Sequence, residues 1–206
     1  MFDVSLRTKS HAALTPLALR FRGTSPAVLT LAGGAVGLAS AGAAGAGWWI
    51  AAVALWLSNR VLDGFDGIVA RADGTASDAG GYLDMTVDVL VYATVPLGVA
   101  VGLGTVEAWV AVAVLQATFF FNTITWSYLS AVLEKRQAGA ASTGESTSVT
   151  MPAGLVEGAE TIVLFTLILL APLISSGLSI GLMWAMAVLV SVGAVVRTRH
   201  GMGVLR

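Results

Sequence analysis

Four aspartates stand in two apolar segments of the chain, where carboxylates are costly to accommodate. Asp63 and Asp66 are three residues apart, and Asp84 and Asp88 are four residues apart. On a helix, either spacing places both members of a pair on the same face. A charged side chain inside a bilayer usually faces a cavity or a partner, because exposure to lipid costs several kcal/mol. The four carboxylates are therefore candidates for one common site.

The segments that carry the two pairs are joined by a short connection, residues 72–79, so we expect antiparallel neighbouring helices. Four carboxylates can then meet at similar depth, where they repel one another unless a cation lies between them. Arg71 alone supplies too little charge, whereas one or two divalent ions would balance the group. Oxygen ligands select Mg²⁺, Mn²⁺ or Ca²⁺, and Mg²⁺ held by carboxylates commonly binds a substrate phosphate. The alternative is that the aspartates only cap helix ends or face water.

Small residues accompany the carboxylates. Gly67 and Ala70 follow the first pair, and Gly80 precedes the second. Small side chains let backbones and ligands come close together, although ordinary helix packing uses them as well. Arg71 stands at the mouth of this cluster, where a guanidinium could hold a phosphate through two hydrogen bonds or could serve as a membrane anchor.

The composition indicates a protein that spans a membrane several times. Of the 206 residues, 56% are hydrophobic and 11% are charged, whereas a soluble domain has roughly 25% charged residues. These values exclude a soluble globular domain, a disordered chain and a coiled coil. A net charge of −1 provides no field that would attract nucleic acid. The chain has no cysteine, and His11 is far from His200, so any metal site should use oxygen ligands.

Six apolar segments have the roughly 20 residues that a helix needs to cross a bilayer. Glycine-rich or polar breaks separate them, and tryptophans stand near several of their ends, as is typical of the headgroup region. We therefore predict an all-α membrane protein with six transmembrane helices. The six segments are 26–44, 48–69, 80–103, 106–129, 154–174 and 177–196.

The basic residues predict the orientation of these helices. All 11 lysines and arginines fall on the side of the N-terminus, the second-to-third connection, the fourth-to-fifth connection or the C-terminus. With six spans these places share one side of the membrane, which the positive-inside rule identifies as the cytoplasm. We therefore expect both termini and the carboxylates at the cytoplasmic side of a bacterial inner membrane.

Three further segments should lie at this cytoplasmic surface. Residues 1–24 do not have the pattern of a secretory signal, because Arg20 and Arg22 interrupt the apolar stretch. Apolar residues recur there at near-helical spacing, which predicts an amphipathic helix on the inner leaflet, with a disordered tail as the alternative. Residues 134–152 should form a polar connection, and residues 197–206 a cytoplasmic tail after the bundle of residues 26–196.

The spacing of the carboxylates and their small neighbours resembles the signature of the CDP-alcohol phosphotransferase family. The resemblance lies in the run Asp63-x2-Asp66-Gly67-x2-Ala70-Arg71-x8-Gly80-x3-Asp84-x3-Asp88. It implies one membrane enzyme domain, residues 1–206, that works as a homodimer in phospholipid biosynthesis. Such an enzyme transfers a substituted phosphate group from a CDP-alcohol, such as CDP-diacylglycerol, to an acceptor hydroxyl and releases CMP.

The resemblance also implies roles for individual residues. Asp63, Asp66 and Asp84 would bind two divalent ions, Mg²⁺ or Mn²⁺, while Asp88 would touch one ion and act as the general base. Two such ions could stabilise the attacking and leaving oxygens together, and a hydroxyl nucleophile needs a base that accepts its proton. The positions expected around the CDP-alcohol are Gly67, Ala70, Arg71, Ser77 and Thr30.

The acceptor stays open among glycerol 3-phosphate, inositol phosphate and serine. Family members with phosphorylated acceptors place basic residues in the cytoplasmic parts of the later helices, although the positive-inside rule explains such residues equally well. Glu157 and Glu160 could orient the acceptor or simply favour a helix N-terminus. The basic candidates here are Lys135, Arg136, Arg197 and Arg199.

Two other classes of membrane protein also place carboxylates in helices. An intramembrane prenyltransferase of the UbiA type is suggested by Asn59-x3-Asp63, but its next carboxylate would come one residue after Asp66, and that class needs more helices. A small cation transporter would not require Gly67 or Arg71 at these spacings. A non-catalytic family member is disfavoured because all four aspartates are present.

Overall fold

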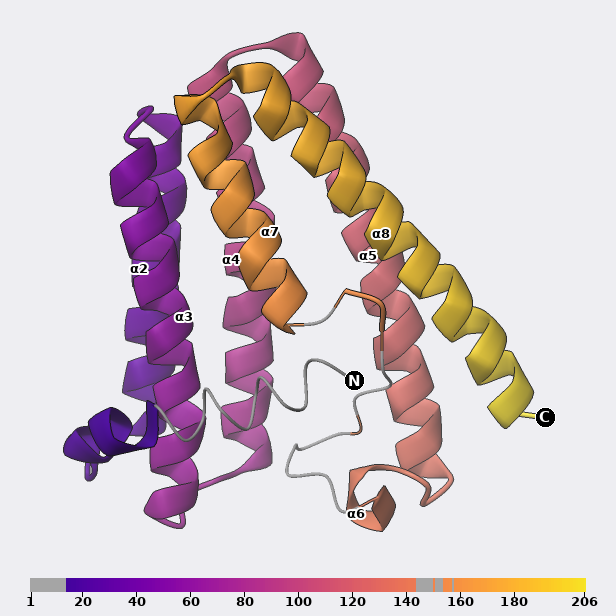
Figure 1. Ribbon diagram of the computed structural model, residues 1–206. Coiled ribbons are helices and arrows are strands. Elements are labelled where there is room, and N and C mark those ends of the chain that lie inside the picture. Colours follow the sequence, from indigo (N-terminus) through magenta and orange to yellow (C-terminus); the bar gives the residue numbers. More distant parts are fainter. Residues whose placement is uncertain (1–13, 144–149, 151–153, 157) are drawn as a thin grey trace.

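The computed structural model describes residues 14–143, 150, 154–156 and 158–206, and no strand occurs in these ranges. The predicted all-α fold is therefore confirmed for the described part of the chain (Figure 1). In chain order the elements are η1 (Leu19–Phe21), α2 (Pro26–Gly45), α3 (Trp49–Ala72), α4 (Asp78–Leu103), α5 (Val106–Lys135), α6 (Ala140–Thr143), α7 (Gly158–Leu170), η2 (Ala171–Leu173) and α8 (Ser176–Val204).

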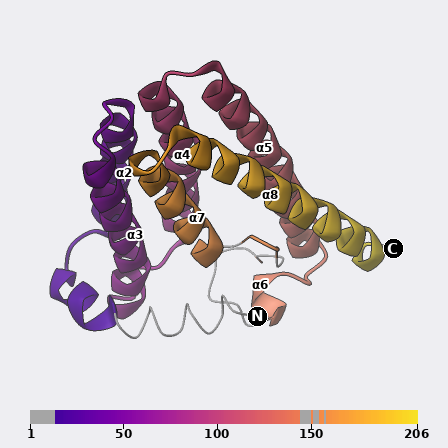
Figure 2. The same cartoon turned by 45° about the horizontal axis from the view of Figure 1, so that its top comes forward.

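The longer helices run alternately up and down and form two packed groups joined by α7 (Figures 1 and 2). Helix α2 packs along both α3 and α4, while α5 packs along α8, and α7 contacts α3 and α8. By length and composition, α2, α4, α5 and α8 can each cross a membrane. Helix α3 has the length but carries several charges, and α7 with η2 is shorter, so the count of six spans stays a prediction.

Side-chain caps and glycines set the ends of these helices. The hydroxyl groups of Ser77, Thr105 and Ser175 accept hydrogen bonds from amides in the first turns of α4, α5 and α8, at 3.1–3.2 Å. Each cap satisfies an amide that has no partner inside its helix. Gly104 ends α4 with φ 64°, a left-handed conformation that costs glycine little. Because the helices begin and end at these residues, the connections between them are short.

Helices α2 and α4 approach each other closely because glycines line their contact. Gly34 and Gly37 of α2 face Val87 and Val91 of α4, with no room for a side chain at either glycine. On α4, Gly98 lies directly against the backbone of α2. This close approach brings the start of α2 beside the carboxylate-bearing turns of α3 and α4.

An aromatic cluster fills the middle of the bundle. Trp56 of α3 and Phe165 of α7 have ring centroids 5.1 Å apart, and Tyr92 of α4 meets Phe165 edge-on at 5.7 Å. The indole NH of Trp56 also donates to the Ile162 carbonyl of α7, at 3.4 Å. The cluster therefore holds α3, α4 and α7 at a fixed separation, one turn from Asp88 on α4 and two turns from Asp63 on α3.

The N-terminal segment packs against the end of α3 that carries the aspartates. Residues 14–18 are helical and continue into η1, which confirms part of the predicted juxtamembrane helix, whereas residues 1–13 lie outside the described ranges. Phe21 contacts Phe65 at 5.6 Å. The Gly23 amide and the Arg22 guanidinium both donate to Asp73 at 2.8 Å, and they lower the pKa of that carboxyl. The segment is thus tied to the connection between α3 and α4.

Two helices extend past their predicted ends. Helix α5 continues to Lys135, and α8 continues to Val204, so the predicted tail of residues 197–206 is mostly helical. The apolar pattern ends near the membrane surface, but the backbone hydrogen bonds of a helix do not depend on it. In the following connection, the Glu134 carboxylate accepts from the amides of Ala140 and Thr150, both at 2.8 Å.

Candidate active site

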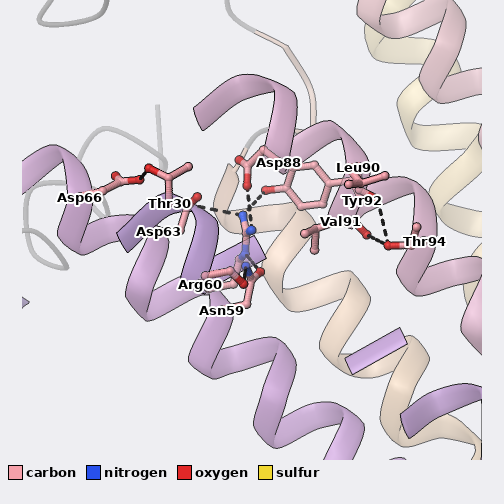
Figure 3. A network of polar contacts seen from close by, with 11 residues as sticks. Thr30, Asn59, Arg60, Asp63, Asp66, Asp88, Leu90, Val91, Tyr92 and Thr94 are labelled. Carbon is pink, nitrogen blue, oxygen red and sulfur yellow. Dashed lines mark hydrogen bonds and ion pairs between the residues drawn. The ribbon is translucent and has the colours of Figure 1, made fainter. Parts of the chain in front are cut away.

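Figure 3 shows how Asp63, Asp66 and Asp88 lie relative to one another. Asp63 and Asp66 project from successive turns of α3, and Asp84 and Asp88 from successive turns of α4. Asp63 and Asp88 turn toward one guanidinium between the two helices, while Asp66 turns toward α2. One member of each pair, Asp63 of α3 and Asp88 of α4, therefore lies at the contact between these two helices.

Asp66 is held by a hydroxyl from another helix. The Thr30 hydroxyl of α2 donates to Asp66 Oδ2 at 2.5 Å, and the Gly67 amide donates to Oδ1 at 2.5 Å. Thr30 and Asp66 are both buried, at 5% and 7% exposure. Because both carboxylate oxygens have a donor, the orientation of Asp66 is fixed. The structure thus gives Thr30 a contact that the sequence did not predict.

Besides Arg71, Arg60 of α3 places a second positive charge beside the carboxylates. Its Nη2 donates to Asp88 Oδ1 at 2.7 Å, and its Nη1 lies 3.6 Å from Asp63 Oδ2. From the sequence, Arg60 is expected only as one of the basic residues that orient the helices. A signal was available, because Arg60 precedes Asp63 by three residues and so shares its helix face.

The guanidinium of Arg60 is enclosed by aromatic and polar groups. The rings of Trp56 and Tyr92 each have their centroid 4.9 Å from its central carbon. Its Nε donates to Asn59 Oδ1 at 2.7 Å, and its Nη1 donates to the Tyr92 hydroxyl at 2.8 Å. The Asn59 amide in turn donates to the Gly33 carbonyl of α2 at 2.8 Å. Residues of three helices thus position this one charge (Figure 3).

Asp84 has a buried carboxylate oxygen that needs a partner. Its Oδ1 makes no hydrogen bond with any described residue. A buried polar atom without a partner costs about 1–3 kcal/mol. Such an atom is therefore a candidate ligand for a bound ion or substrate. An all-oxygen donor set on two facing helices suits Mg²⁺ or Mn²⁺. On these two grounds the residues present fit a divalent ion.

The carboxylates are not gathered into a finished metal site. Among the described residues, no three acidic or histidine side chains have the close spacing that holds an ion. Asp66 turns toward Thr30, and Asp63 and Asp88 turn toward Arg60. An ion would therefore compete with these donors for the same oxygens.

The residues expected around the CDP-alcohol lie at the end of α3 and the start of α4. The Arg71 guanidinium lies over Gly67, where a Cβ atom would come within 3.2 Å of Nη1. Gly67 therefore leaves room for Arg71 beside Asp66. Ala70 is half-buried, and Ser77 caps α4 as described above, which is a structural role visible without any ligand.

The basic residues expected to bind the acceptor lie in different surroundings. Arg197 is 6% exposed between α5 and α8, and its Nη1 donates to Asn122 Oδ1 at 2.7 Å. Arg136 instead donates to the Leu205 carbonyl at 2.9 Å, and Lys135 is exposed at the end of α5. Arg199 is exposed on α8 and Glu160 lies on α7, whereas Glu157 is outside the described residues.

Comparison with known proteins places the chain in a family. The sequence profile of the family described as CDP-alcohol phosphatidyltransferase matches residues 23–193. Inner membrane protein YnjF of Escherichia coli (strain K12) is 36% identical over 150 residues, which cover 73% of this chain and 71% of that protein.

Solved structures share the fold. Phosphatidylinositol phosphate synthase (PgsA1) of Mycobacterium tuberculosis with CDP-DAG bound is 22% identical and superposes with a TM-score of 0.69, over 91% of this chain and 92% of that chain. PgsA1 in complex with manganese and citrate is 23% identical and gives a TM-score of 0.67, over 91% and 88% of the two chains. At these identities the likeness demonstrates the fold alone.

The family profile spans both carboxylate pairs and most of the helical bundle. It confirms the resemblance found in the spacing of the aspartates. The family is metal-dependent, and one of the PgsA1 structures contains manganese. The chain therefore belongs to the CDP-alcohol phosphatidyltransferase family and is a membrane-embedded phosphatidyltransferase of phospholipid biosynthesis.

Proposed function

We propose that the enzyme transfers the phosphatidyl group of CDP-diacylglycerol to a small alcohol at the cytoplasmic face of the inner membrane. The observation that carries this proposal is the pair of facing carboxylate turns on α3 and α4, with Asp84 Oδ1 buried and lacking a partner. The donor is suggested by the CDP-DAG in one PgsA1 structure, and the membrane by the inner membrane protein YnjF.

In this proposal the four aspartates divide into ligands and a base. Asp63, Asp66, Asp84 and Asp88 would hold two divalent ions, Mg²⁺ or Mn²⁺, which would neutralise the pyrophosphate and stabilise the leaving CMP. Asp88 accepts the proton of the acceptor hydroxyl, whose oxygen attacks the phosphorus next to the lipid. The bond from that phosphorus to CMP breaks, and CMP leaves.

The phosphates of the donor would lie over the end of α3. Gly67 leaves space there for the planar guanidinium of Arg71, which can hold two phosphate oxygens at once. Ala70, Ser77 and Thr30 stay as predicted neighbours of the CDP-alcohol. This arrangement keeps the lipid chains in the bilayer while the nucleotide remains at the cytoplasmic surface.

We further propose that the acceptor carries a phosphate, with glycerol 3-phosphate as the first choice and inositol phosphate as the second. Arg197 supports this choice, because a guanidinium buried between helices keeps its charge and suits an anion. Lys135 and Arg136 lie at the end of α5 and are weaker candidates. Serine carries no phosphate, so a serine acceptor would not need a basic residue for that group.

The test is CMP release by the purified protein with CDP-diacylglycerol and Mg²⁺, against a panel of acceptors, with mass spectrometry of the lipid product. We expect CMP release with a phosphorylated acceptor and none after chelation with EDTA. Release with serine alone would refute the phosphorylated acceptor. The size of the purified protein in detergent would show whether the expected homodimer forms.

The proposed base has its own variant. Asp88→Asn should keep binding of CDP-diacylglycerol but reduce CMP release by at least about a hundredfold, because removal of a general base costs 10²–10⁴-fold. Binding of the donor to the variant is the control for folding. Turnover at the wild-type rate would remove Asp88 as the base.

A further inference from the structure

We propose that Arg60 is a built-in cation of the active site, which aligns Asp88 for proton transfer and balances Asp63 and Asp88 before any metal ion binds. The inference rests on the proposed role of Asp88. It gives Arg60 a task that neither membrane anchoring nor substrate binding provides. Arg60 is a positioning residue in this account, because it acts through the two aspartates.

Arg60 is not placed as a membrane anchor or a substrate ligand. It is 9% exposed, in the interior of the bundle, whereas an anchoring arginine extends its charge to the water. All three of its nitrogens already have partners, namely Asn59, Tyr92 and the two aspartates. Three of its five N–H groups donate to these protein acceptors, which ties the guanidinium to the aspartates and to Tyr92.

The contacts of Arg60 fix one side of the Asp88 carboxylate. Its Nη2 holds Oδ1 at 2.7 Å, which leaves Oδ2 as the oxygen that Arg60 does not engage and that can accept the proton of the acceptor hydroxyl. The two aromatic rings and Asn59 prevent the guanidinium from swinging away. Such a support keeps a base within the narrow range of geometries that catalysis requires. A lysine would keep the charge but lose the planar fork.

The charge of Arg60 also bears on metal binding. Without it, Asp63 and Asp88 would face each other in the interior with no cation between them. The metal-free protein should then lose more stability than the metal-loaded protein, because bound ions can replace the missing charge. A role in packing alone would lower the stability of both forms equally.

The experiment compares three variants of the purified full-length protein with wild type. Arg60→Met removes the charge at similar length, Arg60→Lys restores the charge without the fork, and Tyr92→Phe removes one hydrogen bond but keeps the ring. The unfolding temperature is measured in EDTA and in saturating MnCl₂. The kcat and the KM for CDP-diacylglycerol are measured with Mn²⁺.

We expect the Mn²⁺-dependent rise in unfolding temperature to be larger in Arg60→Met than in wild type and to return toward wild type in Arg60→Lys. Both variants should lose about a hundredfold in kcat, which is the typical cost of misplacing a catalytic group by about 1 Å. The KM for the donor should stay within about twofold, because Arg60 does not hold the donor. Tyr92→Phe should show a smaller loss of kcat, also at unchanged KM.

Two outcomes overturn the inference, and they are distinguishable from a failure of the proposed function. If Mn²⁺ raises the unfolding temperature of wild type and Arg60→Met equally, Arg60 is not the counterion. If kcat is unchanged in Arg60→Lys and Tyr92→Phe, Arg60 does not position the base. If wild type shows no rise with Mn²⁺, the proposed metal site itself is wrong, and the inference falls with it.

Discussion

Thr30 illustrates how one hydroxyl can control a carboxylate from a different helix. Its hydrogen bond to Asp66 crosses from α2 to α3, and both groups are buried. We predict that Thr30→Val raises the Mg²⁺ concentration needed for half-maximal activity by about 10–100-fold, which is the usual cost of losing an outer-shell partner. Thr30→Ser, which keeps the hydroxyl, is the matched control. An unchanged Mg²⁺ requirement in Thr30→Val would contradict this role.

The four aspartates could be predicted from the sequence, but the cation between them could not be assigned. Spacings of three and four residues determine which side chains share a helix face, so both pairs follow from local geometry. The contact between Arg60 and Asp88 instead depends on how α3 and α4 are shifted along each other. Trp56 and Tyr92 position this guanidinium from two different helices, and no spacing within one helix reveals their arrangement.

At the scale of elements, the contact between α2 and α4 depends on glycine at few positions. A Cβ atom at Gly98 would overlap the backbone of Ala41, which has no flexible end to move aside. We predict that Gly98→Ala separates the two helices and destabilises the protein by about 1–3 kcal/mol, as overpacked sites do. A lower unfolding temperature in detergent, with a matching loss of activity, would show this.

The matched control is a glycine of α2 that lies next to Ala41 in the sequence but is exposed. Nothing is within 4 Å of a Cβ atom at Gly42 of α2. Gly42→Ala should therefore leave the unfolding temperature unchanged or raise it, because alanine is the better helix former. Equal losses in both variants would mean that glycine matters in α2 and α4 for a reason other than close packing.

The helices themselves were largely predictable, and their ends were not. The length of the apolar segments identifies α2, α4, α5 and α8 as helices that can cross a bilayer, and the breaks contain caps such as Ser175 and turns such as Gly104. Helices α5 and α8 continue beyond the apolar pattern, to Lys135 and Val204, because the backbone hydrogen bonds of a helix do not require apolar side chains. The hydrophobic pattern predicts which part of a helix lies in the bilayer, but it does not predict where the helix ends.

At the scale of the whole molecule, the predicted orientation can be tested cleanly because the chain contains no cysteine. Single cysteines at Ala46 and Gly177, in the breaks before α3 and at the start of α8, should react in intact cells with a reagent that does not cross the inner membrane. A cysteine at Thr75, between α3 and α4, should react only after lysis. All three positions are exposed.

This labelling also tests the count of six spans. With α3 and α7 in the membrane, Ala46 and Gly177 share one side and Thr75 the other. Labelling of Thr75→Cys in intact cells would place the carboxylate ends of α3 and α4 outside the cytoplasm. The positive-inside orientation would then be wrong for this protein.

The burial of Arg60 has a consequence for how the protein is made. On scales of insertion by the translocon, an arginine or aspartate near the centre of a helix costs about 2.5–3.5 kcal/mol. Helix α3 carries Arg60, Asp63 and Asp66, so it is a poor candidate to leave the translocon alone. Its counter-charge, Asp88, emerges from the ribosome some 28 residues after Arg60. The nascent α3 should therefore wait for α4, and the two helices should enter the lipid together as a hairpin.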